Sequence, residues 1–395
     1  MTASGPRNSP GDGKDSGTGA EAAPAVRAVD VATLGESMVA FRPSRPGRLA
    51  DVPSFQRGIG GAESNVACAL AAAGHSVRWV SRVGADGFGD HLVETIGSWG
   101  VDVDAVRRDP HRPTGVYFRT AGDRATDAHE VAYYRAGSAA SAMSARTIDV
   151  AALRACRVLH LSGITAALSG DCLELLRELT APGPGRPLVS FDVNFRPALW
   201  PDADGPRVLL ELARRADIVF VGDDEARAAW DLRGGRAVRE ALPEPGIVVV
   251  KQGADGATAF ERNAERAGEA GAADGAATHG AGTHDTATHG TATHDTDTRV
   301  AAPRVDVVAH VGAGDAFAAG FLSATLRGLP VRDRLRHGHL AAAAALTVPG
   351  DLAAPPARDH ADRLAALDDA AWGRLRLGPG WTRTARRAEE EVRTP

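Results

Sequence analysis

The stretch LVSFDVNFRPALWPDADGPRVLLELARRADIVFV, residues 188–221, decides the fold class of this chain. Its two ends, Leu188–Val193 and Ile218–Val221, are short apolar runs that predict buried strands. Between them, Val208–Ala216 reads as a helix. A strand, a helix and a second strand in this order predict a βαβ unit, and therefore parallel strands.

The same alternation continues on both sides of this stretch. Further strands are predicted at Ala28–Leu34, Val77–Val83, Val158–Ser162 and Ile247–Lys251. Further helices are predicted at Glu63–Ala73, Gly89–Trp99, Asp171–Leu179 and Ala316–Arg327. Strands that alternate with helices indicate an α/β fold, with a mostly parallel sheet covered by helices on both faces.

Two segments, about 36–57 and 112–137, interrupt this rhythm with extended, alternating sequence. They predict a small separate β-element, which we expect to form a lid over the carboxyl ends of the main strands, where open α/β sheets bind ligands. All three tyrosines of the chain, Tyr117, Tyr133 and Tyr134, fall in the second segment. They suit a polar, aromatic ligand surface, although packing between neighbouring strands explains them almost as well.

The remaining segments are expected to lie outside the packed domain, which we place at residues 28–375. Residues 1–27 read as a disordered leader and 376–395 as a tail. Residues 261–298 form a low-complexity insertion in which Thr-His recurs every five residues. The histidines His279, His284, His289 and His294 could gather around a cation, but a spacing of five suits neither one helix face nor one strand face. A solvated loop is the favoured interpretation.

Composition narrows the function. The chain has 395 residues, of which 44% are hydrophobic and 24% charged, as in ordinary globular proteins. Its net charge of −5 gives no general attraction to nucleic acid or anionic membranes. The longest uncharged apolar stretch, Leu340 to Val348, is far shorter than the ~20 residues that cross a bilayer. We therefore expect small-molecule partners and a cytoplasmic location.

The sharpest local signal is the sequence VGAGDAF at residues 311–317, directly before a helical run. Glycines here allow close approach of the backbone, and the start of a helix directs unpaired N–H groups and a positive dipole end at one point. Such a point favours an anion. Asp315 would serve there either as a base that takes a proton from an attacking hydroxyl or simply as an acid that stabilises its helix.

Three polar residues, Asp192, Asn194 and Arg196, follow on one side of a predicted strand end. Arg196 can clamp a carboxylate or phosphate, and the other two could order the waters of a bound metal. Glu225 follows another strand, where it could help hold Mg²⁺ or could only cap a helix. Lys251, at a further strand end, could contact a nucleotide or be an ordinary surface residue.

These motifs together resemble the ribokinase-like (PfkB) carbohydrate kinases across roughly residues 28 to 354. The resemblance rests on GGAESNVA at 60–67 and GAGD at 312–315, which have the order and separation of that family. Short matches at 35–38, 113–117, 133–135, 138–141, 162–165 and 192–196 look most like the 2-keto-3-deoxygluconate kinases. The family implies a three-layer α/β/α doubly wound fold with a β-sheet lid, and transfer of the γ-phosphoryl of ATP, with Mg²⁺, to a primary sugar hydroxyl.

The resemblance also implies roles for individual residues. Asp315 would be the base, and Gly312, Ala313 and Gly314 would form the anion hole. Positions that match the sugar-acid pocket are Gly61, Asn65, Tyr117, Tyr133, Arg135, Ile164 and Arg196. Positions that match the nucleotide site are Asn194, Lys251, Gly253, Gly256 and His339. Positions that match the magnesium site are Glu225 and Asp192. Arg135 and Arg196 favour a carboxylated substrate, because a neutral sugar would leave both guanidinium groups without a partner.

The chain departs from the family at three places. Ala309-His310 stand where Asp-Thr is usual, so an aspartate that often helps to bind a monovalent cation is missing. Gly222 replaces the Asn of the Asn-x-x-Glu magnesium motif, with Asp223 or Asp224 as possible substitutes, and His339 replaces an Asn near the adenine. Two alternatives stay beside a sugar-acid kinase. One is a kinase for a neutral sugar such as fructose or ribose, and the other is a sugar-binding module without catalysis, which Ala309, His310 and Gly222 favour. A homodimer formed through the lid is also expected.

Overall fold

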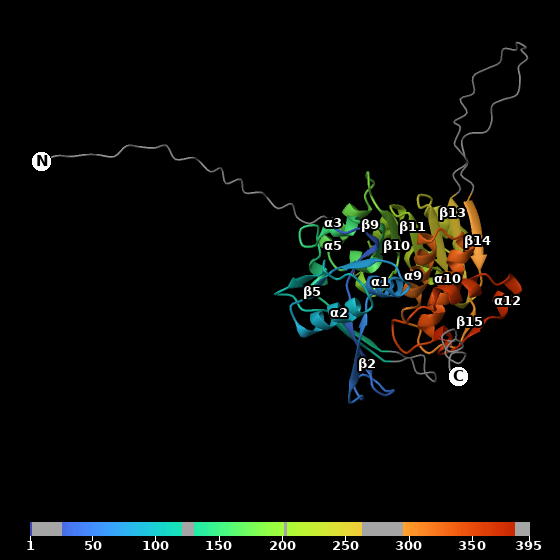
Figure 1. Cartoon of the computed structure of the whole chain (residues 1–395), viewed down its shortest axis with the longest axis horizontal. Coiled ribbons are helices and arrows are strands. Elements are labelled where there is room, and N and C mark those ends of the chain that lie inside the picture. Colours follow the sequence, from blue (N-terminus) through green and yellow to red (C-terminus); the bar gives the residue numbers. More distant parts are fainter. Residues whose placement is uncertain (2–25, 121–129, 201–203, 263–294, 384–395) are drawn as a thin grey trace, which may run out of the picture.

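An eight-stranded sheet forms the centre of the computed structural model, which describes residues 1, 26–120, 130–200, 204–262 and 295–383 (Figure 1). The strand order is β14-β13-β12-β11-β10-β9-β1-β4. The strands are Val29–Leu34 (β1), Val77–Val80 (β4), Cys156–Ser162 (β9), Leu188–Asp192 (β10), Ile218–Gly222 (β11), Ile247–Lys251 (β12), Ala257–Arg262 (β13) and Asp295–Val300 (β14). Neighbouring strands from β4 to β12 pair in parallel. Strand β13 pairs antiparallel with both β12 and β14. The expected mostly parallel sheet is confirmed.

Helices cover both faces because successive side chains of each strand point to opposite sides. In β11, Ile218 and Phe220 join one hydrophobic core, whereas Val219 and Val221 join the other. The first core packs on Ala62–Ala72 (α1), Gly87–Ser98 (α2), Ala313–Leu326 (α9), Val331–Leu346 (α10), Arg358–Ala365 (α11) and Asp369–Arg374 (α12). The second packs on Val150–Arg154 (α3), Gly170–Thr180 (α5), Gly205–Arg214 (α6), Asp223–Trp230 (α7) and Gly235–Ala241 (α8). The result is three layers, α/β/α.

The predicted lid is a separate four-stranded sheet in the order β3-β2-β7-β8. Its strands are Met38–Pro43 (β2), Phe55–Gly60 (β3), Val116–Arg119 (β7) and Val131–Tyr134 (β8). Strand β2 follows closely on the carboxyl end of β1 and projects away from the main body in Figure 1. The lid therefore starts at the edge of the main sheet where the parallel strands end.

One predicted strand, Val77–Val83, is two strands in the structure. Strand β4 ends at Val80, and Arg82–Gly84 (β5) leaves the main sheet to pair with Arg107–Asp109 (β6). Ser81 lies between them, and its hydroxyl donates a 2.8 Å hydrogen bond to the carbonyl of Gly35, just beyond the end of β1. The sequence pattern does not reveal this break, because Val83 is apolar and as buried as the residues of β4.

The folded domain extends beyond the expected boundary at residue 375. Arg376–Leu377 (β16) pairs with Arg304–Val305 (β15), and Trp381 is only 8% exposed. The ends of the expected insertion are also strand residues, because β13 reaches Arg262 and β14 begins at Asp295. The four repeat histidines, most of the leader and the last part of the tail lie outside the described residues. No helix in the described ranges is long and apolar enough to cross a bilayer.

Candidate active site

The two motifs that carry the resemblance meet at the carboxyl edge of the main sheet. Asn65 lies in the first turn of α1 and Asp315 in the first turn of α9, and these helices pack against each other on one face. The Asn65 Nδ2 atom donates a 2.8 Å hydrogen bond to Asp315 Oδ2. The Oδ1 atom of Asn65 is buried and has no hydrogen-bond partner among the described residues, so it could still accept a bond from a ligand.

The surroundings of Asp315 make its carboxyl a suitable base. Burial raises the pKa of Asp315 to about 7, and the negative charges of Asp192 and Glu63 also raise it. The hydrogen bond from Asn65 and the charge of Lys251 act in the opposite direction. A group with a pKa near neutral can take a proton in one step and release it in the next, which is what general base catalysis requires.

The loop before α9 packs closely against Asp351. Gly312 has a φ of 81°, in the left-handed region, and a Cβ at that position would lie 2.1 Å from the carbonyl oxygen of Asp351. The N–H groups of the first helical turn, including Ala313 and Gly314, have no acceptor within the helix. A Cβ at Gly314 would lie 3.6 Å from Lys251 Nζ. Backbone N–H groups and a cation therefore converge beside Asp315.

Lys251 is held by Asp192 on a neighbouring part of the sheet. Their Nζ and Oδ2 atoms are 2.8 Å apart, and the side chains are 18% and 5% exposed. Burial opposes the charge of Lys251, but the carboxylates of Asp192 and Glu225 outweigh it and raise the pKa of the ammonium group. The second oxygen of Asp192, Oδ1, is buried without a hydrogen-bond partner in the described part of the chain. The prediction that Lys251 could be a surface residue is wrong.

Arg196 and Glu225 form a second pair at the same edge. Arg196 Nη1 lies 3.0 Å from Glu225 Oε1, while Glu225 Oε2 accepts a 2.9 Å hydrogen bond from the N–H of Gly222. Glu225 therefore caps α7, as one interpretation of the sequence held, and also contacts Arg196. The Arg196 side chain is 53% exposed, so part of its guanidinium group remains open to a ligand.

Tyr117 of the lid lies against Asp351. The Tyr117 hydroxyl donates a 2.8 Å hydrogen bond to Asp351 Oδ2, and Arg119 forms an ion pair with the same carboxylate. Tyr133 stacks on Tyr117 with ring centroids 5.5 Å apart. Tyr117 is 6% exposed and Tyr133 is 57% exposed, so Tyr133 is the more accessible of the two rings.

Arg135, by contrast, forms an ion pair with an acidic side chain of the chain itself. It forms a buried ion pair with Glu36, which also accepts a hydrogen bond from the hydroxyl of Ser138. Arg196 is likewise paired with Glu225. Both arginines expected to bind a substrate carboxylate therefore have carboxylate partners within the chain. The argument that a neutral sugar would leave two guanidinium groups unpaired is therefore wrong.

The other expected nucleotide residues fall into two groups. A Cβ at Gly256 would lie 2.2 Å from the carbonyl oxygen of Val300, and His339 Nε2 lies 3.2 Å from the same oxygen. Burial lowers the pKa of His339 to about 4, and its ring packs on the edge of Phe317. His339 is thus part of the core.

Two further positions, Gly253 and Asn194, have left-handed backbone, with φ values of 57° and 42°. The Oδ1 atom of Asn194 is buried without a hydrogen-bond partner among the described residues.

Sequence reasoning missed two acidic residues of this region. Glu63 is fully buried, and its Oε1 atom accepts hydrogen bonds from Ser162 at 2.7 Å and Thr165 at 2.6 Å, on either side of Ile164. It lies inside the quoted motif 60–67, which could have drawn attention to it. Asp351 belongs to no motif, and only the fold brings it to Tyr117 and Gly312.

The acidic residues do not form a complete metal cage. The described residues contain no group of three or more His, Cys, Asp or Glu side chains that could hold a metal ion. Mg²⁺, however, is usually held by one or two carboxylates together with waters and phosphate oxygens. The unpartnered Oδ1 atom of Asp192 fits that mode of binding.

Comparison with known proteins gives a consistent result. The family model described as "pfkB family carbohydrate kinase" matches residues 28–358. A 2-dehydro-3-deoxygluconokinase of Bacillus subtilis (strain 168) is 32% identical over 340 residues, covering 84% of this chain and 94% of that protein. The enzyme of the same name from Thermoproteus tenax is 30% identical, covering 86% and 95%. A probable chloroplastic fructokinase-6 of Arabidopsis thaliana is 28% identical, covering 80% and 77%.

Solved structures agree on the fold. A PfkB protein from Polaromonas sp. JS666 superposes with a TM-score of 0.65 and 32% sequence identity, covering 85% of this chain and 99% of that one. A putative ribokinase II from E. coli, solved in complex with ATP and Mg²⁺, superposes with a TM-score of 0.68 at 22% identity, covering 85% and 98%. The three-layer sandwich with its lid is thus a ribokinase-like fold.

Proposed function

The chain belongs to the pfkB family of carbohydrate kinases, and from this premise we propose that it phosphorylates a sugar acid, 2-keto-3-deoxygluconate, with ATP as the phosphoryl donor. The observation that carries the proposal is the buried Asp315 carboxyl, with its pKa near 7, at the amino-terminal end of α9. That position combines a base with a cluster of anion-binding N–H groups, which are the two protein functions that phosphoryl transfer needs most.

In the proposed reaction, Asp315 accepts the proton of a primary sugar hydroxyl. The hydroxyl oxygen forms a new bond to the γ-phosphorus of ATP while the bond from that phosphorus to the leaving oxygen of ADP breaks. The N–H groups of Gly312, Ala313 and Gly314, together with Lys251, stabilise the negative charge of the transferring group. Asn65 holds one oxygen of Asp315 and leaves the other free for the hydroxyl.

The nucleotide would lie over the edge formed by Asn194, Lys251, Gly253 and Gly256. Mg²⁺ supplies charge neutralisation of the phosphates when it is bound, and Asp192 and Glu225 are the residues that would hold it, directly or through water. Lys251 orients the Asp192 carboxylate, because its Nζ atom lies 2.8 Å from Asp192 Oδ2. The structure of similar fold from E. coli was solved with ATP and Mg²⁺, which agrees with the choice of these two cofactors.

The sugar acid would lie between the lid and the edge of the sheet. Gly61, Tyr133, Ile164 and the open side of Arg196 would line its pocket. A Cβ at Gly61 would lie 2.4 Å from the carbonyl oxygen of Glu36, so only glycine lets the lid approach α1 this closely. Arg196 is the better candidate for the substrate carboxylate, because it is half exposed whereas Arg135 is buried against Glu36.

A neutral sugar such as fructose is the second candidate. It is favoured by one observation, the presence of an acidic partner beside both Arg135 and Arg196. Since these charges are balanced within the chain, a substrate without a carboxylate would leave no guanidinium group unpaired. The similarity to a fructokinase points the same way. A binding module without catalysis is not favoured, because Asp315 and its contact with Asn65 are intact.

We also propose that two lids associate in a homodimer of a cytoplasmic enzyme. Strand β8 is an edge of the lid sheet and exposes Val131, Tyr133 and Tyr134 at 40%, 57% and 65%. Exposed edges with large apolar residues tend to pair with another chain. Light scattering on the purified protein tests the dimer, and Tyr134→Lys should convert it to a monomer.

The experiment that tests the function is an assay of ATP consumption with Mg²⁺ on five candidate acceptors. These are 2-keto-3-deoxygluconate, its galactonate epimer, gluconate, fructose and ribose. Turnover confined to the two keto-deoxy acids is the expected result. Turnover on fructose or ribose alone would keep the kinase and replace the substrate, and no turnover on any of them, despite binding, would favour the non-catalytic module.

A further inference from the structure

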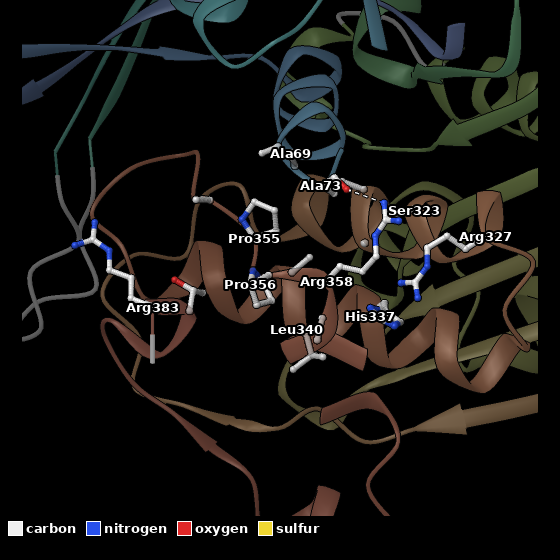
Figure 2. Close-up of a pocket in the computed structure, with 18 residues that line it drawn as sticks. Ala69, Ala73, Ser323, Arg327, His337, Leu340, Pro355, Pro356, Arg358 and Arg383 are labelled. Carbon is white, nitrogen blue, oxygen red and sulfur yellow. Dashed lines mark hydrogen bonds between the residues drawn. The ribbon is translucent and has the colours of Figure 1, made fainter. Parts of the chain in front are cut away.

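A cavity lies away from the proposed active-site residues. It has a volume of about 410 Å³ and lies among the carboxyl-terminal ends of α1 and α9, the middle of α10 and the segment 354–358 that leads into α11 (Figure 2). None of the residues assigned above to sugar, nucleotide or metal lines it. Asp315 and Arg327 are separated by about 18 Å along α9, at 1.5 Å per residue. The cavity residues of this helix and its C-cap run from Ala319 to Arg327.

The wall of this distal cavity combines an apolar surface with positive charge. Its apolar part consists of alanines, Leu340 and the prolines Pro355 and Pro356. Its charged part consists of Arg327, Arg358 and Arg383, with His337 nearby, and no acidic side chain is among the described residues that line it. Figure 2 shows Arg327, Arg358 and His337 together on one side of the cavity and Arg383 on the opposite side.

The cations differ in how far they are neutralised. Arg327 contacts both oxygens of Asp362, at 2.8 and 2.7 Å, and His337 lies 3.1 Å from the same carboxylate. Arg358 donates a 3.1 Å hydrogen bond to the carbonyl oxygen of Ala73 and forms no ion pair within the described ranges. It therefore brings an uncompensated charge, with further N–H donors, to the cavity.

From these features we propose that the distal cavity binds a small organic anion, a molecule with a carboxylate or phosphate group on a compact apolar body. The volume is within the range of small-molecule sites, about 300–1,000 Å³. The planar fork of Arg358 matches the geometry of carboxylate and phosphate oxygens, and the alanines and prolines provide the surface for the apolar body. The ligand would bind at a place separate from the ATP and sugar residues.

The position of the cavity connects it to the active site through two parts of the chain. Helix α9 carries Asp315 at one end and the cavity residues Ser323 and Arg327 at the other. The cavity segment 354–358 begins only three residues after Asp351, whose carbonyl oxygen lies against Gly312 and whose carboxylate binds Tyr117. A ligand in the distal cavity therefore contacts both elements that position the anion hole.

The test is calorimetric titration of the full chain with three probes: inorganic phosphate, citrate and 3-phosphoglycerate. We expect at least one probe to bind the wild-type protein and to bind Arg358→Ala about tenfold or more weakly, because a charge-assisted hydrogen bond is lost. Arg363→Ala is the matched control, since Arg363 lies on the same helix, pairs with Asp359 and does not line the cavity. It should bind the probe as the wild type does.

A second variant fills the cavity without changing any charge. Ala72 lines the cavity from an exposed position of α1, so Ala72→Phe should fold and should also weaken binding. Phosphate binding without citrate binding would identify a phosphate ligand, and the reverse a carboxylate. The proposal is overturned if no probe binds the wild type at millimolar concentration, or if all variants bind the probe equally. It is also overturned if the affinity for the probe falls in Lys251→Met and not in Arg358→Ala, because the anion would then bind in the active site.

Discussion

The side-chain amide of Asn65 donates a 2.8 Å hydrogen bond to the carboxylate of Asp315, across 250 positions of sequence. This contact joins α1, which follows the lid strand β3, to α9, which begins at the proposed anion hole. It fixes one carboxylate oxygen of Asp315, and in the proposed reaction the other oxygen would accept the hydroxyl proton. The pair thereby connects α1 and α9 at the carboxyl group that is proposed to receive the proton.

The first prediction concerns the base itself. Asp315→Asn should lower kcat by about a hundredfold to ten thousandfold, because an amide cannot accept the hydroxyl proton. The dissociation constants of ATP and sugar should change little, since the variant has nearly the same shape. Steady-state kinetics together with calorimetric binding check both expectations. An unchanged kcat would show that Asp315 is only a residue of the first helical turn.

The second prediction is a pH profile. The carboxylate form of Asp315 is the active base, so kcat/KM should rise with pH and level off above the pKa of about 7. The hydrogen bond from Asn65 stabilises the ionised form and lowers this pKa. Asn65→Ala removes it, and the acidic limb of the profile should therefore move to higher pH. A limb that stays in place would show that another group controls the rate.

The alternation of apolar strands and helices predicted most of the fold. Buried strands such as β11 and β12 have nearly continuous apolar sequence, which only a sheet covered on both faces explains. The end of β4 at Val80 could not be predicted, because the signal for it is a side-chain hydrogen bond from Ser81 to a distant carbonyl. The folded segment 376–383 was also missed, since its two-residue strand β16 has no periodicity of its own.

The candidate site was predicted unevenly for a similar reason. Asp315, Asn65 and Lys251 lie in or beside recognisable motifs at strand and helix ends, where local sequence indicates their position. The ion pairs of Arg135 with Glu36 and of Arg196 with Glu225 depend on side chains from different elements. Sequence shows which charges are present and not which of them neutralise one another, so the argument for an acidic substrate was overstated.

The third prediction addresses substrate specificity. Arg196→Lys keeps the charge and loses the planar fork, so KM should rise for an acidic sugar and stay nearly constant for a neutral one. Arg227→Lys is the matched control, because Arg227 also pairs with an acid of α7, Asp223, and is similarly exposed at 51%. Its KM values should equal those of the wild type. Equal increases for acidic and neutral sugars in Arg196→Lys would show that Arg196 does not recognise the carboxylate.

The fourth prediction concerns the buried pair of Lys251 and Asp192. Lys251→Met leaves the Asp192 carboxylate buried without its partner, so the free energy of unfolding should fall by about 3 kcal/mol. The double variant Lys251→Met/Asp192→Asn should recover part of this loss, because no buried charge remains. Arg154→Ala breaks an exposed pair with Glu178, at 55% and 46% exposure, and should cost less than about 1 kcal/mol. Urea denaturation measures all three.

The last prediction separates backbone conformation from close contact at the anion hole. Gly312 and Gly328 flank α9 and have left-handed φ values of 81° and 71°. Alanine at either position should cost about 1–2 kcal/mol of stability for the conformation alone. A Cβ at Gly328 meets nothing within 4 Å, whereas a Cβ at Gly312 would lie 2.1 Å from the Asp351 carbonyl. Gly328→Ala should therefore lower the melting temperature and keep kcat, while Gly312→Ala should displace the loop and lower kcat at least tenfold. Equal kcat values in the two variants would show that contact with Asp351 does not position the anion hole.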